Sequence, residues 1–450
     1  MGFVSNISKG GLIINKIRTF VSFAFIISLL FIFTSCSLNQ SNQISFKDYS
    51  KVLSADDIYT NVLVLANKDN ARITGFDGEK NAAVYISKQF KSIGLEVEVQ
   101  SFPITAFQCN GTELKINGQN NIIINSKALT FTAPTPKEGF SAKIVDGDMG
   151  TADLLKQADV KNKIVLIKRG GEFFKVKTER AANAGALGVI FYDSDPKSEQ
   201  PVSASLSSLS KIPAISIGRV DGDSLKKQIS SNKDLEVTLK VDSICVPSES
   251  QNVIATLKAE KETKDTKTLV IGAHYDGVDT PAANDNASGI STVIEIAKLL
   301  SKEPVKCNVK FIAFGSEETG LVGSTYFVEN LGAEINDMIG MINLDMVGAG
   351  NNLVINTLLK DSKPFPAELA EAFAKDFNYS YTRNESSRSD HVPFAINGIA
   401  EVFFEYGPST GYHTDEDNIS IIEKDALAKV CNIATSIANE IATKPDKYIQ

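Results

Sequence analysis

The sequence lacks several features that define common classes of protein. Its five cysteines include no pair at CxxC spacing, which argues against a zinc site built from thiolates. The net charge is −8 and no basic segment stands out, so no nucleic-acid partner is expected. No segment recurs at a period of roughly 20–50 residues, which argues against a solenoid. Tryptophan is also absent, and that absence excludes nothing.

The composition is that of an ordinary globular protein, with 43% hydrophobic and 22% charged residues. A chain of 450 residues is too long for one ordinary hydrophobic core. We therefore expect two domains and a targeting segment.

The N-terminal 36 residues have the layout of an export signal. Lys9, Lys16 and Arg18 precede an almost wholly apolar stretch over 19–33. That stretch is shorter than the roughly 20 residues that a membrane-spanning helix needs. The sequence therefore predicts export across the cytoplasmic membrane.

The apolar stretch ends in small residues before a lone cysteine, Cys36, and this pattern resembles the lipobox of bacterial lipoproteins. It departs from the usual pattern at Phe33, where leucine is common. The resemblance implies that Cys36 is lipidated and becomes the mature N-terminus, with residues 37–50 as a polar tether. An uncleaved anchor is the alternative, and both readings place the remainder outside the membrane.

The sequence changes character twice after residue 50. Residues 51–108 predict two helices and a strand, and the helix Ala82–Ile93 stops at Gly94. Residues 109–247 predict a compact, mostly β unit with one helix near Val176–Ala184. From residue 248, strands alternate with helices, which predicts an α/β fold: a mixed, mostly parallel sheet flanked by helices.

Histidines and carboxylates lie close to the predicted strands of this last part. The strands are Leu269–Gly272, Val309–Phe314, Met338–Met346, Leu353–Asn356 and Ala400–Phe404. The polar residues are His274, Asp276, Asp285, Glu317, Glu318, Asp345 and His413. Because the carboxyl ends of strands share one edge of an open α/β sheet, these distant residues can converge there.

Each of these motifs alone has an ordinary structural explanation. A histidine at a strand end, a surface Glu-Glu pair and an Asn-Asp-Asn turn at 284–286 are all common without a metal. Five such sites beside predicted strands make coincidence improbable. Since all of them offer nitrogen or oxygen donors that zinc accepts, the set predicts a metal site.

The set resembles the M28 family of zinc aminopeptidases. The shared motifs are HYD at 274–276, NDNASG at 284–289, GSEE at 315–318, NLD at 343–345 and YH at 412–413. The resemblance covers about residues 250–443 and extends back to 72–102. It implies a zinc exopeptidase with the phosphorylase/hydrolase-like fold, which removes the N-terminal residue of peptides.

Carried over position by position, the resemblance implies a role for each metal ligand. His274 and Asp345 would bind one zinc ion, and Glu318 and His413 would bind a second. Asp285 would bridge the two ions, and in the family the peptide bond after the bridging aspartate is cis.

The resemblance also names supporting residues. Glu317 would be the general base, and Asp276 would orient His274. Tyr412 would donate to the oxyanion of the transition state, or pack as an ordinary aromatic residue. His391 is a possible pocket residue, or it makes a structural hydrogen bond.

The chemistry expected of such a site is hydrolysis of the N-terminal peptide bond of extracellular peptides. Two zinc ions roughly 3.5–4 Å apart lower the pKa of a bridging water and polarise the carbonyl. Glu317 would take the proton of that water and deliver it to the leaving amine. The sequence predicts neither the preferred N-terminal residue nor the oligomeric state.

Three other functions remain as alternatives. A carboxypeptidase of the same superfamily would need a site for a C-terminal carboxylate, and no clear arginine cluster marks one. A glutaminyl cyclase-like transferase shares the fold, but residues 283–289 match the peptidase form better. A non-catalytic receptor would have lost ligands, and none is missing here.

The region from 109 to 247 resembles a protease-associated (PA) domain inserted into the peptidase. The resemblance rests on segments 163–170 and 181–190, with Phe174 and Lys177 between them. It departs at Gly171 and Glu172, where the family often has a cysteine. The insert would overhang the cleft and limit the size of the substrate.

Cys109 and Cys245 stand at the two junctions of this insert. The ends of an insert lie close together, and an exported chain meets an oxidising environment. A disulfide between them is therefore a hypothesis, which a Cα–Cα distance above about 7 Å would exclude.

Overall fold

The computed structural model describes residues 44–118, 121–193, 195, 199–359, 362 and 364–449. The predicted export signal and Cys36 lie outside these residues. The chain divides into two units, Met1–Phe46 and Lys47–Gln450, and the described helices and strands belong to the second. In the described part of the chain, no helix is both long enough and apolar enough to cross a membrane.

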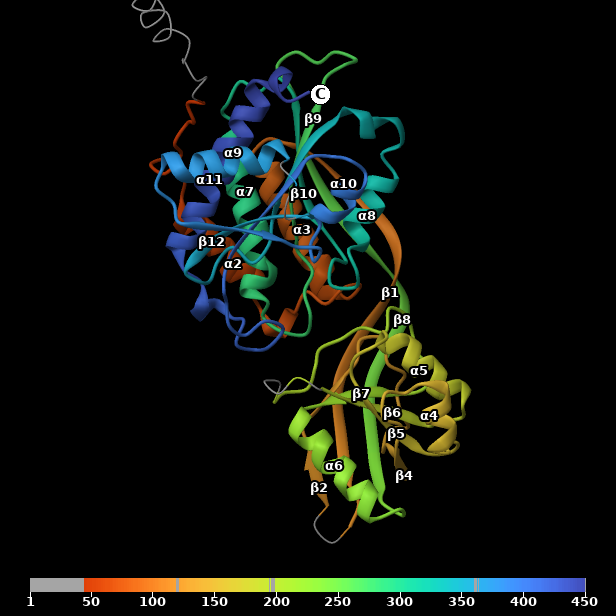
Figure 1. Cartoon of the computed structure of the whole chain (residues 1–450). Helices are drawn as coiled ribbons and strands as arrows, with labels where there is room; N and C mark the ends of the chain where they lie inside the picture. Colours follow the sequence, from red (N-terminus) through yellow and green to blue (C-terminus); the bar gives the residue numbers. More distant parts are fainter. Residues whose placement is uncertain are drawn as a thin grey trace, which may run out of the picture. The chain divides into compact units, whose positions relative to one another are not determined.

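The described strands join in one mixed sheet of 14 strands (Figure 1). Its central strands are β14 (Glu401–Gly407), β11 (Met338–Leu344), β9 (Thr268–His274) and β10 (Asn308–Phe314), each parallel to its neighbour. Beyond β14 lie β12 (Asn352–Thr357), which is antiparallel to it, and β13 (Tyr381–Glu385). The predicted α/β class is thus confirmed, although β13 was not predicted.

Helices cover both faces of this sheet. One layer consists of α2 (Ala55–Leu65), α3 (Asp77–Ser92), α7 (Gly289–Leu300), α9 (Phe365–Asp376) and α11 (Lys424–Thr443). The other layer consists of α8 (Val322–Glu329) and α10 (His391–Ile396). Every residue of β9 and β11 is buried, as expected for parallel strands covered on both faces.

Two long antiparallel strands connect this sheet to the inserted region. β1 (Glu96–Ile116) pairs with β8 (Glu236–Leu257) over almost their whole length, and β8 also pairs with β10 (Figure 1). The predicted insert limits, 109 and 247, fall inside these two strands. The backbone therefore continues from one part to the other without a linker.

The insert contains more helix than the sequence predicted. Its strands are β2 (Ile122–Ile124), β3 (Ser126–Ala128), β4 (Phe140–Asp146), β5 (Ile164–Lys168), β6 (Gly188–Tyr192) and β7 (Ala214–Ile217). Its helices are α4 (Ala152–Gln157), α5 (Phe174–Asn183) and α6 (Arg219–Ser231), and only α5 was predicted. The short α4 and the polar α6 bury few side chains, so their apolar periodicity is weak.

The hypothesis of a disulfide between Cys109 and Cys245 is wrong for this structure, in which both thiols are free. The β1–β8 register sets Cys245 opposite Phe107 and Cys109 opposite Ser243. The two cysteines are therefore diagonal neighbours, and such residues lie roughly 7–8 Å apart, beyond the usual span of a disulfide.

Helix α3 supplies a test of the packing. Phe90 is fully buried with its ring centroid 6.4 Å from that of Phe311 on β10, whereas Val84 of the same helix is 55% exposed. We expect Phe90→Ala to destabilise the fold by about 3–5 kcal/mol, because it leaves a cavity under the helix. Val84→Ala should change stability by less than about 0.5 kcal/mol. Thermal unfolding measures both, and equal effects would contradict this packing.

Candidate metal centre

The predicted metal ligands converge at one edge of the sheet. His274 ends β9, Glu317 and Glu318 follow β10, and Asp345 follows β11. His413 lies in the loop after β14, and Asp285 lies in the short helical turn η2 (Ala283–Ser288). Since β14, β11, β9 and β10 are parallel, their carboxyl ends meet at this edge.

Asp285 lies between the two histidines and offers one oxygen to each. Its Oδ1 is 3.2 Å from Nε2 of His274, and its Oδ2 is 3.1 Å from Nε2 of His413. Asp345 Oδ1 lies 3.3 Å from His274 Nε2, and Glu318 Oε2 lies 3.0 Å from His413 Nε2. Two sets of three donors thus share one carboxylate.

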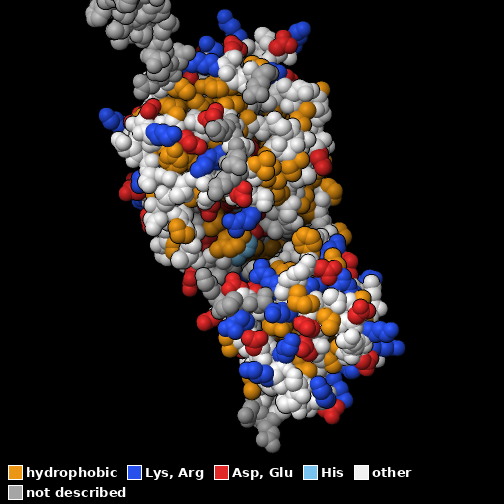
Figure 2. All heavy atoms as spheres, viewed as in Figure 1, with side chains coloured by type: hydrophobic (Ala, Val, Ile, Leu, Met, Phe, Trp, Pro, Cys, Tyr) orange, Lys and Arg blue, Asp and Glu red, His pale blue; other side chains and the backbone are white. Residues whose placement is uncertain are grey.

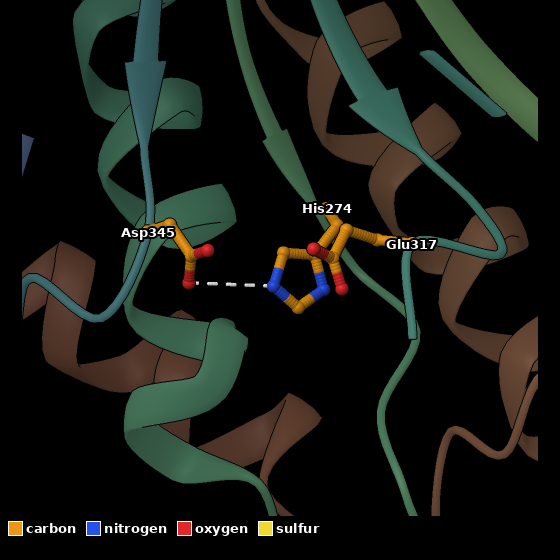
Figure 3. A group of neighbouring side chains, drawn as sticks. All are labelled: His274, Glu317 and Asp345. Atoms are coloured by element: carbon orange, nitrogen blue, oxygen red, sulfur yellow. Dashed lines mark hydrogen bonds and ion pairs between the residues drawn. The ribbon is translucent and has the colours of Figure 1, made fainter. Parts of the chain in front are cut away.

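Glu317 lies beside the first of these sets. One ligand atom each from His274, Glu317 and Asp345 falls within 4.8 Å of the others, and the same holds for Asp285, Glu318 and His413. In Figure 3 the carboxylates of Glu317 and Asp345 are both directed toward the imidazole of His274. Glu317 is therefore within reach of whatever binds at His274 and Asp345.

Asp276 lies closer to the loop that carries Glu317 and Glu318 than to the imidazole of His274. Its Oδ1 accepts the backbone N–H of Glu317 at 3.0 Å, and its Oδ2 accepts that of Glu318 at 3.2 Å and the hydroxyl of Thr74 at 2.6 Å. Its Oδ1 lies 3.6 Å from Nδ1 of His274, whose nearer partner is the Asp276 carbonyl at 3.3 Å. Asp276 therefore positions both glutamates through their backbone.

Asp417 does the same for the loop that carries Asp285, and sequence reasoning missed it. It is buried, and its carboxylate accepts the backbone N–H groups of Asn284 at 2.7 Å and Asp285 at 3.0 Å. The peptide bond between Asp285 and Asn286 is cis, as the family resemblance implied. The only sequence signal for Asp417 was its place in the acidic run 415–417, shortly after His413.

Arg72 fastens the same loop from the opposite side, again unpredicted. Its guanidinium is buried and donates to the backbone carbonyls of Tyr275 at 2.6 Å, Leu65 at 2.5 Å and Ala282 at 2.8 Å. None of these hydrogen bonds goes to a carboxylate. Arg72 thus organises the backbone of the loop and makes no hydrogen bond to a ligand carboxylate.

Left-handed backbone surrounds the site. His413 and two neighbours of site residues, Ser316 before Glu317 and Met346 after Asp345, have φ values of 56°, 59° and 56°. Residues other than glycine rarely adopt this backbone conformation, and such strained residues concentrate at functional sites. The surrounding hydrogen bonds hold these residues where the ligand geometry requires them.

The charges at the site influence one another strongly. Burial opposes a charge on His413, but Glu318 and Asp285 outweigh it and raise the pKa of His413 to about 10. Although burial favours its neutral form, hydrogen bonds from His274 and His413 hold the pKa of Asp285 below its usual range. Burial, aided by repulsion from Glu318 and Asp390, raises the pKa of Glu317 well above its usual value.

The donor set fits zinc. A tetrahedral ion with bonds of about 2.0–2.1 Å keeps its ligand atoms roughly 3.3 Å apart, close to the spacings of 3.0–3.3 Å observed here. Glu318 Oε1 is buried and has no hydrogen-bond partner among the described residues. Buried carboxylates in excess of nearby cations need a counter-charge, and two divalent ions would supply it.

A cavity of about 300 Å³ opens onto the ligands, and Glu317, Asp345, Met346, Phe403 and Tyr412 are among its lining residues. The ring of Tyr412 is half exposed and stacks on the imidazole of His413, with centroids 3.8 Å apart. Tyr412 can therefore present its hydroxyl to a substrate bound at the ligands.

His391 is not among the residues that line this cavity, and of its two predicted roles the structure favours the structural hydrogen bond. Its Nε2 donates to the carbonyl of Ser386 at 2.8 Å, and its ring stacks on Phe403 at 5.0 Å. Burial lowers its pKa to about 4, so His391 is neutral at physiological pH. It supports Phe403 from behind, because its fully buried ring cannot reach the cavity.

Comparison with known proteins now defines the class. The profile of peptidase family M28 matches residues 252–438, and that of the PA domain matches residues 130–225. A relative of 33% identity, described below, aligns over 90% of this chain. The chain belongs to peptidase family M28 and is an enzyme with a PA domain inserted before the metal-binding part.

Individual relatives agree with this assignment. Aminopeptidase YwaD of Bacillus subtilis is 33% identical over 90% of this chain and 89% of its own length. An aminopeptidase of Pseudomonas aeruginosa is 30% identical over 80% of this chain and 75% of its own. The structure of the zinc aminopeptidase BSAP from Bacillus subtilis superposes with a TM-score of 0.75 at 32% identity, over 87% of this chain and 96% of that one. An aminopeptidase from Aneurinibacillus sp. strain AM-1 gives a TM-score of 0.76 at 31% identity, over 87% and 95%.

The role of Asp417 can be tested against a close neighbour. We expect Asp417→Asn to weaken zinc binding roughly 10–100-fold, because the amide nitrogen would replace one of the two accepting oxygens and face a backbone N–H of Asn284 or Asp285. Asp415→Asn is the matched control, since Asp415 is 74% exposed and pairs with Lys68 at 3.0 Å. Competition with a chelating dye measures the affinity, and an unchanged value for Asp417→Asn would refute this role.

Proposed function

We propose that this enzyme is a two-zinc aminopeptidase that releases the N-terminal residue of peptides. The central support is Asp285, whose two oxygens lie 3.2 Å and 3.1 Å from the Nε2 atoms of His274 and His413. One carboxylate shared by two donor sets suits two neighbouring ions better than one. The relatives named aminopeptidase, one of them a zinc aminopeptidase, support the choice of the N-terminal bond.

The ligands would divide between two ions. His274 and Asp345 would hold one, Glu318 and His413 the other, and Asp285 both. When bound, zinc supplies Lewis acidity, which polarises a carbonyl oxygen and lowers the pKa of water. In this arrangement every ligand follows a strand or a loop whose backbone is hydrogen-bonded in place, so the donors need little rearrangement to bind.

Glu317 would move the proton. Asp276 holds its backbone N–H, which leaves the carboxylate beside His274 and Asp345 and at the wall of the substrate cavity. From there it can accept a proton from the attacking water and pass it to the leaving amine. Tyr412, at the same wall, can donate its hydroxyl to the developing oxyanion.

Two neighbouring glutamates give a sharp test. Glu317→Gln should retain both zinc ions and lose roughly 10²–10⁴-fold in kcat, because it removes the base and preserves the shape. Glu318→Ala should instead lose metal from one site. Release of p-nitroaniline from leucine p-nitroanilide gives the rate, and elemental analysis gives the metal content.

N-acetyl-leucine p-nitroanilide completes this test, because an aminopeptidase requires a free N-terminal amine. Cleavage of the acetylated substrate at the same rate would contradict an aminopeptidase. Full activity of Glu317→Gln would contradict the assignment of the base.

We also propose that the enzyme acts outside the cytoplasmic membrane, anchored by lipid on Cys36. The support is the basic and apolar sequence before Cys36 and the small residues next to it. Cys36→Ser should abolish lipidation. The variant should then either leave the membrane fraction or keep its uncleaved signal segment. Labelling with a radioactive fatty acid that is lost in Cys36→Ser would agree, and equal labelling of both proteins would refute the lipid site.

A further inference from the structure

A second cavity, of about 330 Å³, adjoins the metal centre on the side of Glu318 and His413. Its wall comes partly from the peptidase and partly from the insert, which contributes residues of β1 and β3 together with Ser203 and Ala204. The volume lies at the small end of the roughly 300–1,000 Å³ typical of ligand sites. The insert therefore bounds a small space directly beside the metal ligands.

Lys127 of β3 brings a positive charge into this cavity. Its ammonium donates to the hydroxyl of Ser203 at 2.7 Å and lies 3.5 Å from the carbonyl oxygen of His413. Both partners are neutral, so these contacts leave its charge without a carboxylate partner. Burial lowers the pKa of Lys127 while Glu318 raises it, as expected for an ammonium near the ligand cluster.

The two cavities beside the metal centre differ in charge. The cavity at Tyr412 is lined by the carboxylates of Glu317, Asp345 and Glu405, with Arg388 as its cation. The cavity at His413 is lined by Lys127 and by two acids: Glu318, which is a candidate metal ligand, and Asp279, which pairs with Lys68 at 3.2 Å. An acidic cavity suits the N-terminal ammonium end of a peptide, whereas the ammonium of Lys127, whose hydrogen bonds go to neutral groups, suits a carboxylate.

Figure 2 shows histidine at the surface of the molecule. A small area of histidine, in pale blue, lies among hydrophobic side chains, with Lys or Arg side chains in blue close by. His274 and His391 are buried, whereas the side chain of His413 keeps 15% of its surface exposed. A bound peptide can thus reach the ligands and the insert at the same time.

We propose that Lys127 binds a carboxylate on the leaving-group side of the substrate, so that the inserted domain selects short peptides with a negative charge just beyond the scissile bond. The inference rests on the proposed aminopeptidase function. The carboxylate is either the C-terminus of a dipeptide or an acidic side chain of the residue after the scissile bond. Each residue extends the chain by roughly 3.3–3.6 Å, so only the first residues of the leaving group fit beside Lys127.

The test compares peptides that differ only in charge. The substrates are Leu-Ala, Leu-Ala-amide, Leu-Asp-amide and Leu-Asn-amide, and release of free leucine gives kcat/KM. The kcat/KM of the wild-type enzyme should be roughly 10-fold or more higher for Leu-Ala than for its amide, or for Leu-Asp-amide than for Leu-Asn-amide. The uncharged member of each pair lacks the carboxylate that would form a charged hydrogen bond with Lys127. The pair that shows the preference identifies the source of the carboxylate.

Variants of Lys127 assign the preference to this residue. Lys127→Gln should bring the favoured ratio close to one, and Lys127→Arg should keep most of it. Lys211→Gln, an exposed lysine of the same inserted domain, should leave the ratio at its wild-type value. Equal rates for both pairs with the wild-type enzyme, or an unchanged ratio in Lys127→Gln, would overturn the proposal. If the enzyme releases leucine from none of the four peptides, the proposed aminopeptidase function itself is refuted.

Discussion

The structure is organised around a buried concentration of negative charge that would repel itself if nothing held it. Asp285, Glu317, Glu318 and Asp345 gather at the ends of parallel strands. Two further carboxylates clamp the backbone of the ligand loops, Asp276 at 3.0 Å from the Glu317 nitrogen and Asp417 at 2.7 Å from that of Asn284. Acidic groups therefore position other acidic groups here, and bound cations would relieve the repulsion among them.

Sequence reasoning reached the ligands because their motifs are local. Most of the ligands lie at or shortly after the end of an apolar strand, and parallel strands end at a common edge, so the convergence of the ligands could be predicted. Asp417 and Arg72 could not, because their partners lie 132 and 203 residues away, on loops whose approach depends on tertiary packing. For the same reason, sequence reasoning could not decide between the two roles of His391, because its stacking on Phe403 depends on tertiary packing.

The inserted domain shows where a change in sequence character misleads. The predicted limits of 109 and 247 marked a real change from helix-containing to β-rich sequence, yet both lie inside continuous strands, Glu96–Ile116 and Glu236–Leu257. Those strands serve two cores: Phe102 and Ile254 are buried in the peptidase half, and Leu114 and Leu239 belong to the core of the insert. The boundary is therefore a change of packing partner along a strand, and the residues Asn110, Gly111 and Pro247, which usually mark turns, lie inside the paired strands.

The β1–β8 ribbon has a mechanical consequence. Two strands paired along their length resist sliding better than two loose connections would, because sliding one past the other must break many backbone hydrogen bonds together. The register shifts between Cys109 and Gly111, and a bulge of this kind is where a ribbon bends. Bending of the ribbon would concentrate at that point. It would change the width of the cavity that the insert and the peptidase part enclose beside Glu318 and His413.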